Sequence, residues 1–508
     1  MSPPFVATNT RPDPLRDRPG RSGLRARFAN RETLAGPRLR RDERRPLGDA
    51  SACKFIFWSF QCRAVAAILP KALKSEAVGE DTMRSTTSKL HRMLLVSLLV
   101  TAAVGGPTAT RSVAADLDVV LEWNALAIST MSSQPPFAQA RFAAIAQLAV
   151  FEAVNAVTSD YQPYLGTIDA PDGASADAAA VAAAHAVLKN YFPASATSLD
   201  AARASSLAAI PDGTAKDDGI ATGVAAAAAM IAARVGDGSA PPTNKPPGPA
   251  APGVWQMTPS CPAAGGIFFN WQNVTPFGID SVASFMPGPP PSLTSNTYTK
   301  DYLEVKTVGS LSSTARPQDR ADVVRFYAVS SPTRVLNDAA RQVSVAQGRS
   351  LSENARALAL LNMAISDSLV TSFATKYHYN WWRPETAIRA GDTDDNPKTN
   401  PDASFVPFIT TPCFPSYPSN HASGTGSGAE ILRRLYGAGG HSITLSNPAV
   451  AGITLHYTTF KQITDDVDDA RVYGGIHFRF EQEVGGRLGR DIATYIVKHD
   501  LRGPDDPD

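Results

Sequence analysis

Two basic residues stand among aromatic residues in the segment 376–384, which reads KYHYNWWRP. Lys376 and Arg383 are seven residues apart, so they share one face if a helix continues to Pro384. The interleaved tyrosines and tryptophans indicate a largely buried segment, and buried cations need anionic partners. Two ordinary surface charges are the alternative, since most Lys and Arg are exposed, but that reading leaves the aromatic neighbours unexplained.

A second polar segment, residues 418–428 (PSNHASGTGSG), places a hydroxyl, an amide and an imidazole side by side. Pro418 is suited to open a helix, whose first N–H groups have no intrahelical acceptor. Together with the Ser419 hydroxyl they would form a cradle for an oxyanion, and His421 would exchange protons with its occupant. A nucleotide-binding loop is not indicated, because no strand precedes the incomplete glycine pattern. Close helix packing explains the three glycines better.

The third segment, residues 470–481, reads ARVYGGIHFRFE. The two glycines permit a tight loop, so that Arg471 and His477 can converge on one point. Glu481 follows His477 by four residues, which predicts a shared helical face and a carboxylate that orients the imidazole. A single histidine is more often a satisfied core residue. Together, however, the three segments supply two histidines, three cations and a hydroxyl, and this set predicts a binding site for one anion.

The elements that must position these residues are helices. Apolar residues recur at steps of three and four over residues 137–158, 174–192, 198–210, 221–235, 299–308, 318–327, 337–347 and 353–374. No stretch shows sustained strand alternation, and Pro-rich connectors occupy 240–252 and 286–292. We therefore predict an all-α fold of helical bundles. An Ala-rich helical region would cover 116–252, and a helical catalytic region would cover 253–508.

The segment 83–115 has the three parts of a secretory signal peptide: a basic start, a short apolar centre from Met93 to Val104, and small residues before Asp116. We expect a protein that is secreted or periplasmic and has no stable membrane insertion after cleavage. Residues 1–82 are Arg-rich and Pro-interrupted, and we interpret them as a non-native or disordered leader with translation starting at Met83. In an oxidising compartment, Cys261 and Cys413 could form a disulfide.

The distribution of charge argues against a nucleic-acid partner. Residues 1–115 contain 20 Lys and Arg against 9 Asp and Glu, whereas residues 116–508 contain 28 against 38. An acidic main body is unsuited to neutralising phosphates along a nucleic acid.

No uninterrupted apolar run reaches the ~20 residues that span a bilayer, which excludes a multi-pass membrane protein.

The three segments resemble a family signature: Lys-x6-Arg-Pro, then Pro-Ser-Gly-His, then Ser-Arg-x5-His-x3-Asp. It is shared by type 2 phosphatidic acid phosphatases, bacterial acid phosphatases and vanadium-dependent haloperoxidases. The Ala-rich helices and the sequences KYHYNWWRP and RVYGGIHFRF are most similar to secreted bacterial vanadium haloperoxidases. The resemblance covers most of residues 116–500.

The resemblance implies a role for each matching residue. Vanadate would be the cofactor, and phosphate could occupy the same site. His477 would ligate vanadium and His421 would act as acid–base catalyst on peroxide. The remaining groups would hold the oxygens of vanadate: Lys376, Arg383, Arg471, Ser419 and the amide of Asn420.

Some positions depart from the family pattern. Asn420 replaces Gly, and we expect its side chain to crowd the metal, although Asn tolerates a positive φ. Ala470 replaces Ser and removes a hydroxyl, whereas Glu481 for Asp is a longer orienting group. Phe414 matches the aromatic position of chloroperoxidase-like members, which bears on the range of halides.

Three functions are compatible with the pattern. The first is a vanadate-dependent peroxidase that uses hydrogen peroxide, a halide and a small organic substrate. The second is a metal-free acid phosphatase with a phosphohistidine on His477 and with His421 protonating the leaving group. The third is an exported helical scaffold with a vestigial pocket. The sequence leaves the oligomeric state open, a homo-oligomer included.

Overall fold

The computed structural model describes residues 118–504, so the predicted leader and signal peptide lie outside the described residues. This range folds into helices joined by loops, with one short hairpin, which confirms the predicted all-α class. The division at residues 252/253 stays a prediction. The elements are α1 (Val119–Thr130), α2 (Pro136–Thr158), α3 (Ala176–Tyr191), α4 (Ala196–Ala208), α5 (Thr214–Ala233), α6 (Asn296–Val308), α7 (Gln318–Ala328), α8 (Pro332–Gln347), α9 (Leu351–Tyr379), α10 (Pro384–Arg389), α11 (Asn420–Tyr436), β1 (Ile443–Ser446), β2 (Thr454–Tyr457), α12 (Phe460–Tyr473) and α13 (Arg479–His499).

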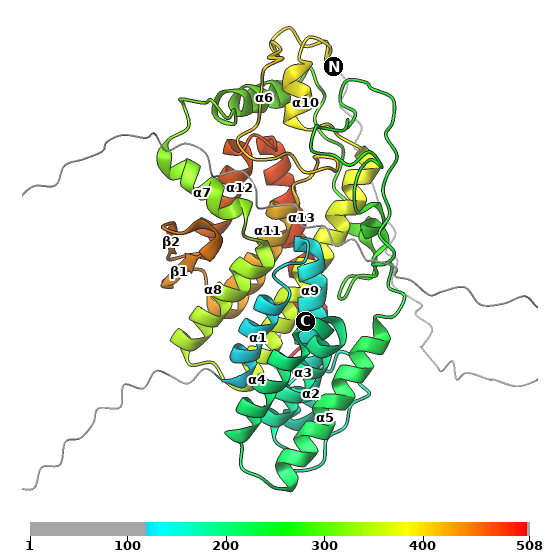
Figure 1. Cartoon of the computed structure of the whole chain (residues 1–508), viewed down its shortest axis with the longest axis vertical. Helices are drawn as coiled ribbons and strands as arrows, with labels where there is room; N and C mark the ends of the chain where they lie inside the picture. Colours follow the sequence, from blue (N-terminus) through cyan, green and yellow to red (C-terminus); the bar gives the residue numbers. More distant parts are fainter. Residues whose placement is uncertain (1–117, 505–508) are drawn as a thin grey trace, which may run out of the picture. The chain divides into compact units, whose positions relative to one another are not determined.

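Helices α2, α3 and α5 lie against one another in a tight bundle (Figure 1). Their contact faces consist mostly of Ala and Gly, which let helix backbones approach closely. A Cβ atom on Gly223 of α5 would lie 2.2 Å from the carbonyl oxygen of Ala179 on α3. The Ala-rich composition that predicts these helices therefore also sets how closely they pack.

Helix α9 is the central element, because α2, α11 and α13 all pack against it. It begins with a capping box, in which the Ser350 hydroxyl accepts the Glu353 N–H and the Glu353 carboxylate accepts the Ser350 N–H. It ends at Asn380, whose left-handed backbone (φ 50°) stops the helix.

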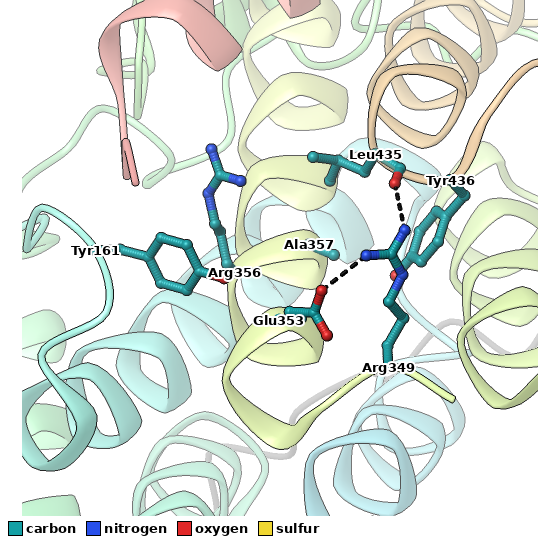
Figure 2. Close-up of a pocket in the computed structure, with 7 residues that line it drawn as sticks. All are labelled: Tyr161, Arg349, Glu353, Arg356, Ala357, Leu435 and Tyr436. Carbon is teal, nitrogen blue, oxygen red and sulfur yellow. Dashed lines mark hydrogen bonds and ion pairs between the residues drawn. The ribbon is translucent and has the colours of Figure 1, made fainter. Parts of the chain in front are cut away.

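The start of α9 is fixed to the end of α11 by Arg349. Its guanidinium donates to the Glu353 carboxylate at 2.7 Å and to the carbonyl oxygen of Leu435 at 2.9 Å (Figure 2). The hollow beside these groups has a volume of only about 60 Å³. These bonds give Arg349 a structural role at the end of α9 opposite Lys376.

Helices α11 and α13 cross at glycines. A Cβ atom on Gly489 would lie 2.2 Å from the carbonyl oxygen of Ser423, and one on Gly485 would lie 2.7 Å from that of Ser419. On α11 itself, a Cβ atom on Gly426 would lie 2.7 Å from the carbonyl oxygen of Gly486, and one on Gly428 would lie 2.4 Å from the side chain of Leu336 on α8, which confirms that the glycines after His421 serve close helix packing. The crossing also fixes the first turn of α11 against α13.

A two-stranded antiparallel hairpin, β1–β2, was not expected from the sequence. Its strands have four residues each, and β1 alternates buried and exposed positions only twice. An alternation this short does not stand out from loop sequence.

Helices α2 and α9 are long and apolar enough to cross a membrane, but 83% and 100% of their most apolar windows are buried inside the protein.

The buried carboxylate of Asp367 and the half-buried carboxylate of Asp500 meet where α9 and α13 approach the loop after residue 276. Asp367 accepts the N–H groups of Phe277 and Gly278 at 2.7 Å each, and Asp500 lies against the same glycine. Burial, followed by the charges of Asp367 and Asp280, raises the pKa of Asp500 to about 7. The ionised form of Asp500 therefore destabilises the fold.

The close crossing of α11 and α13 predicts opposite effects for two glycines on one helix. Gly489→Ala should lower the free energy of unfolding by about 1–3 kcal/mol, because the methyl group meets backbone atoms of α11. At Gly486 the methyl group meets only the flexible end of Arg490, so Gly486→Ala should be neutral or stabilising. Urea denaturation of both variants tests this, and equal losses of stability would contradict the close crossing.

The Asp500 pKa predicts a pH-dependent difference in stability. An unfolded Asp titrates near ~4, so the carboxylate costs stability increasingly as the pH rises from that value to about 7. Asp500→Asn should raise the free energy of unfolding by about 1 kcal/mol at pH 8, after discounting for partial exposure. The gain over the unsubstituted protein should shrink as the pH falls to 5, as measured by urea denaturation. A gain that does not change with pH would contradict this assignment.

Candidate active site

The three polar segments meet at the end of α9, and Lys376 is buried at this end. Its ammonium donates to the carbonyl oxygens of Pro415 (3.0 Å), Ser416 (2.6 Å) and Pro418. Burial, and then the charge of Arg383, lower the pKa of Lys376 well below its usual range. Because all three ammonium N–H groups donate to backbone carbonyl oxygens, Lys376 holds the loop before α11 in position. It also brings a positive charge close to this loop.

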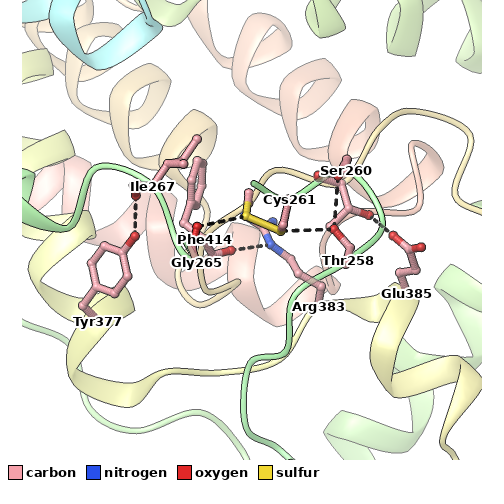
Figure 3. Close-up of a disulfide and its surroundings, with 11 residues drawn as sticks. Thr258, Ser260, Cys261, Gly265, Ile267, Tyr377, Arg383, Glu385 and Phe414 are labelled. Carbon is pink, nitrogen blue, oxygen red and sulfur yellow. Dashed lines mark hydrogen bonds between the residues drawn. A yellow bond between two sulfur atoms is a disulfide. The ribbon is translucent and has the colours of Figure 1, made fainter. Parts of the chain in front are cut away.

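Arg383 lies beyond α9, so the condition for a shared helical face, a helix that continues to Pro384, is not met. The chain turns at Asn380, and Arg383 precedes α10 as its N-cap residue. Its Nε donates to the carbonyl oxygen of Phe414 at 2.9 Å, as Figure 3 shows, and Nη1 lies 3.0 Å from Nε2 of His477. Arg383 thus joins Lys376 through tertiary contacts rather than through a shared helical face.

The ring of Phe414 lies beside both cations. Its centroid is 5.5 Å from Nζ of Lys376 and 5.1 Å from Cζ of Arg383. These distances fall within the range of cation–π attraction. The disulfide between Cys261 and Cys413 links the loop 253–268 to the segment that carries Phe414, the residue after Cys413 (Figure 3).

His477 is oriented by Glu481, as the sequence predicts. Nδ1 of His477 lies 2.6 Å from Oε2 of Glu481, which also accepts the Ser416 hydroxyl at 2.8 Å and the Phe478 N–H at 3.0 Å. The predicted shared helical face is wrong, because α13 begins only at Arg479. With Nδ1 donating to the carboxylate, Nε2 has a lone pair that faces Arg383. The sequence reasoning missed Ser416, although it stands two residues from Pro418.

The first turn of α11 carries the second predicted segment. Ser419, not Pro418, marks its start, and the Ser419 hydroxyl accepts the N–H of Ala422 as an N-cap. Asn420 is already helical and needs no positive φ. Its side-chain oxygen accepts the hydroxyl of Ser372 on α9 at 2.7 Å. The N–H groups of Asn420 and His421 lie in the first turn, where a helix offers no acceptor.

Arg471 lies in the last turn of α12 and completes the set of three buried cations. It is 3% exposed, and its Nε and Nη2 have no hydrogen-bond partner among the described residues. Nη2 of Arg383 is likewise buried without a described partner. Burial lowers the pKa of each arginine to about 10, so both remain charged at neutral pH.

These unpartnered donors match an oxyanion. A tetrahedral anion needs several N–H donors and positive charge, and the two guanidiniums and the first turn of α11 supply them. Within residues 118–504 no cluster of three or more His, Cys, Asp or Glu could hold a metal cation. The donor set therefore fits vanadate or phosphate, with one imidazole as a further ligand.

A cavity of about 220 Å³ opens beside these groups. The predicted residues Phe414, Asn420, His421, Arg471 and His477 line it together. Lys376, Arg383, Ser419 and Glu481 are fully buried, and each is hydrogen-bonded within the segments that form its wall. The sequence reasoning missed the remaining lining residues, which are apolar and come from distant parts of the chain: Pro135, Pro136, Phe137, Phe268, Pro332, Leu369, Pro412 and Ile476.

Both histidines lie in a desolvated, positively charged environment. Burial, and then the three cations, lower the pKa values of His421 and His477 well below their usual range. Burial raises the pKa of Glu481 to about 7, against the pull of Arg383 and Lys376. At neutral pH the imidazoles are therefore neutral, and His421 is able to accept a proton.

Comparisons with known proteins find similarity over the part of the chain that contains these residues. The family described as the VCPO second helical-bundle domain matches residues 356–503, which include all three polar segments. The vanadium chloroperoxidase of Curvularia inaequalis is 28% identical over 127 residues, which are 21% of this chain and 20% of that protein. The match thus spans about a fifth of the length of this relative.

Solved structures extend the likeness to most of the fold. A bacterial vanadium-dependent iodoperoxidase is 26% identical, covers 77% of this chain and 97% of its own, and superposes with a TM-score of 0.63. The holo form of a bacterial vanadium-dependent chloroperoxidase shares the fold at 15% identity and a TM-score of 0.58, covering 73% of this chain and 94% of its own.

The unpartnered guanidinium donors predict that the protein binds inorganic phosphate at a single site. Arg471→Gln should weaken the binding by about 10- to 100-fold, the range for a hydrogen bond to a charged group. Isothermal titration calorimetry at fixed salt measures this. Arg434→Gln, at an exposed arginine paired with Glu430, is the matched control and should bind as the unsubstituted protein does. Equal affinities of all three proteins would contradict the site.

Proposed function

We propose that this member of the vanadium haloperoxidase family is a vanadate-dependent peroxidase that oxidises a halide with hydrogen peroxide. The observation that carries the proposal is the set of buried, unpartnered guanidinium N–H groups beside the lone pair of His477. Buried charge without a partner is strongly destabilising, so an anion that pairs with these groups would be strongly favoured.

Under this proposal each residue has a definite task. Arg383 and Arg471 hold the vanadate oxygens, Lys376 adds positive charge from behind, and Nε2 of His477 ligates the metal. The Ser419 hydroxyl and the N–H groups of the first turn of α11 complete the cradle. Bound vanadate supplies a Lewis acid that makes peroxide electrophilic toward halide.

His421 moves the proton. The overall reaction takes a halide ion, hydrogen peroxide and a proton to hypohalous acid and water. The neutral imidazole accepts a proton from peroxide as peroxide enters, and it returns that proton to the oxygen that leaves as water. Burial, and then the surrounding cations, keep the imidazole neutral before peroxide enters by lowering its pKa.

Glu481 and Ser416 act on His477 rather than on the substrates. The carboxylate fixes the ring through Nδ1 and leaves Nε2 directed into the site. The same geometry suits attack of Nε2 on a phosphoester, so an acid phosphatase is the second candidate function. An inert scaffold is the third, and it gives no reason to keep three buried cations.

We also propose that the protein is exported. The Cys261–Cys413 disulfide supports this, because disulfides persist mainly in oxidising compartments. The signal-like segment 83–115 supports it from the sequence.

The proposed role of His421 predicts the outcome of a direct assay. With vanadate, peroxide and iodide or bromide, the protein should oxidise the halide, and His421→Ala should lose about 10²–10⁴-fold in rate. His456→Ala, at an exposed histidine of β2, is the matched control and should retain the rate. Halide oxidation is followed by triiodide absorbance and by peroxide consumption.

The same samples, without vanadate, are assayed with p-nitrophenyl phosphate. Hydrolysis of this ester without halide oxidation would replace the proposal by the phosphatase. Halide oxidation that His421→Ala leaves unchanged would overturn the role of this residue, and inactivity in both assays would favour the scaffold.

A further inference from the structure

The loop that joins α12 to α13 sets the distance between two residues of the site. Arg471 lies in the last turn of α12, and His477 stands two residues before α13 begins at Arg479. The backbone of this loop also contacts the third residue, because the carbonyl oxygen of Ile476 accepts Nη1 of Arg383 at 3.0 Å. A shift of the loop would therefore change how Arg383, Arg471 and His477 stand relative to one another.

The loop itself, residues 474–478, forms neither helix nor strand. It turns at two adjacent glycines, which give the backbone much conformational freedom, and Gly475 has a φ of 79°. A Cβ atom on Gly475 would collide with the carbonyl oxygen of Gly309, and the carbonyl oxygen of Gly474 accepts the N–H of Ile409 at 3.1 Å. These contacts fix the middle of the turn and leave its two ends to be fixed by other groups.

Arg479 joins the three helices that meet around this loop, α6, α12 and α13 (Figure 1). Its Nη2 lies 2.6 Å from Oε1 of Glu304 on α6, and its Nη1 lies 2.8 Å from Oδ1 of Asp469 on α12. Asp469 stands two residues before Arg471, and Arg479 stands two residues after His477. The ion pair between Arg479 and Asp469 thus closes the loop across its two ends.

Helix α6 holds the start of α13 by a second contact. Phe478, the N-cap residue of α13, makes no side-chain cap hydrogen bond. Instead, the buried carboxylate of Asp301 on α6 accepts the N–H of Phe480 at 2.7 Å. Glu304 follows Asp301 by three residues, so both carboxylates lie on one face of α6. The first turn of α13, which contains Glu481, is therefore held from α6 at two neighbouring residues.

Another arginine shows what an ion pair that serves stability alone looks like. Arg320 on α7 is half-buried, as Arg479 is, and it pairs with the same Asp469 at 3.1 Å and with Asp466 at 2.8 Å. Both of these carboxylates belong to α12, so Arg320 does not bridge the loop. The two arginines thus share a partner and a degree of burial, and they differ in whether they connect α12 to α13.

We propose that Arg479 is a positioning residue of the oxyanion site, which holds α13 to α12 and α6 and thereby sets the spacing at which Arg471 and His477 meet one anion. Arg479 does not line the cavity of the site. Its planar guanidinium bonds two carboxylates at once in a fixed geometry, which a side chain with a single point charge does not reproduce. The proposal rests on the proposed function for the reaction that the site serves, and not for the binding of an anion.

Isothermal titration calorimetry of the full chain with inorganic phosphate tests this role without catalysis. Arg479→Met should bind phosphate about 10- to 100-fold more weakly, the range for groups that orient the ligands of a metal. Arg320→Met is the matched control and should bind phosphate as the unsubstituted protein does. Thermal unfolding of each variant ensures that the affinities are compared on folded protein. Unchanged affinity in Arg479→Met, or equal weakening in both variants, would overturn the positioning role.

The remaining outcomes are also decisive. If Arg479→Met does not fold, Glu304→Gln decides, because it weakens only the hold of α6; it should bind phosphate several-fold more weakly, and unchanged affinity would overturn the role. Absence of phosphate binding by the unsubstituted protein would overturn the oxyanion site and this role with it. Triiodide formation tests halide oxidation separately. Its absence, with the predicted phosphate affinities intact, would overturn the proposed function and leave the positioning role standing.

Discussion

Desolvated positive charge is the constraint on which the rest of this site depends. Lys376 and Arg383 have no exposed surface, and Arg471 is 3% exposed. The penalty for burying each such ion is several kcal/mol, even after relaxation of the surroundings. Glu481 is the one carboxylate hydrogen-bonded to His477 within this group, and a single carboxylate does not balance three cations. The remaining compensation comes from backbone carbonyls around Lys376 and, under the proposed function, from the bound oxyanion.

The fold supplies these contacts through rigid elements. Helix α9 delivers Lys376 from the centre of the molecule, and the glycine crossing of α11 and α13 sets the first turn of α11 against Glu481. The Ala-rich N-terminal bundle contributes as well, because Phe137 and the two prolines before it line the cavity. The apolar wall of the site thus comes partly from the Ala-rich N-terminal bundle and partly from the region after residue 253.

Much of this arrangement follows from the sequence. The spacing of apolar residues predicts most of the helices, and the glycines of the third segment predict the loop that brings Arg471 and His477 together. The pairing of His477 with Glu481 also follows from spacing, although the helix starts later than predicted. The three-dimensional path of Arg383 does not follow, because Asn380 ends α9 in a left-handed conformation that helical spacing does not reveal. The apolar wall is likewise hidden, since Phe137, Phe268 and Pro332 are far apart in the sequence and meet only through tertiary packing. We expected the side chain of Asn420 to crowd the metal. The direction of this side chain is set by the hydroxyl of Ser372 on α9, which donates to the amide oxygen, and spacing along the chain does not reveal that contact.

The central claim is that Arg383, Arg471 and His477 converge on one oxyanion. Diffraction from crystals soaked in vanadate, with the anomalous signal of vanadium, tests it most directly. The account predicts one strong anomalous peak at bonding distance from Nε2 of His477 and within hydrogen-bond reach of both guanidiniums. A peak bound elsewhere on the protein, with none between these three residues, would contradict it.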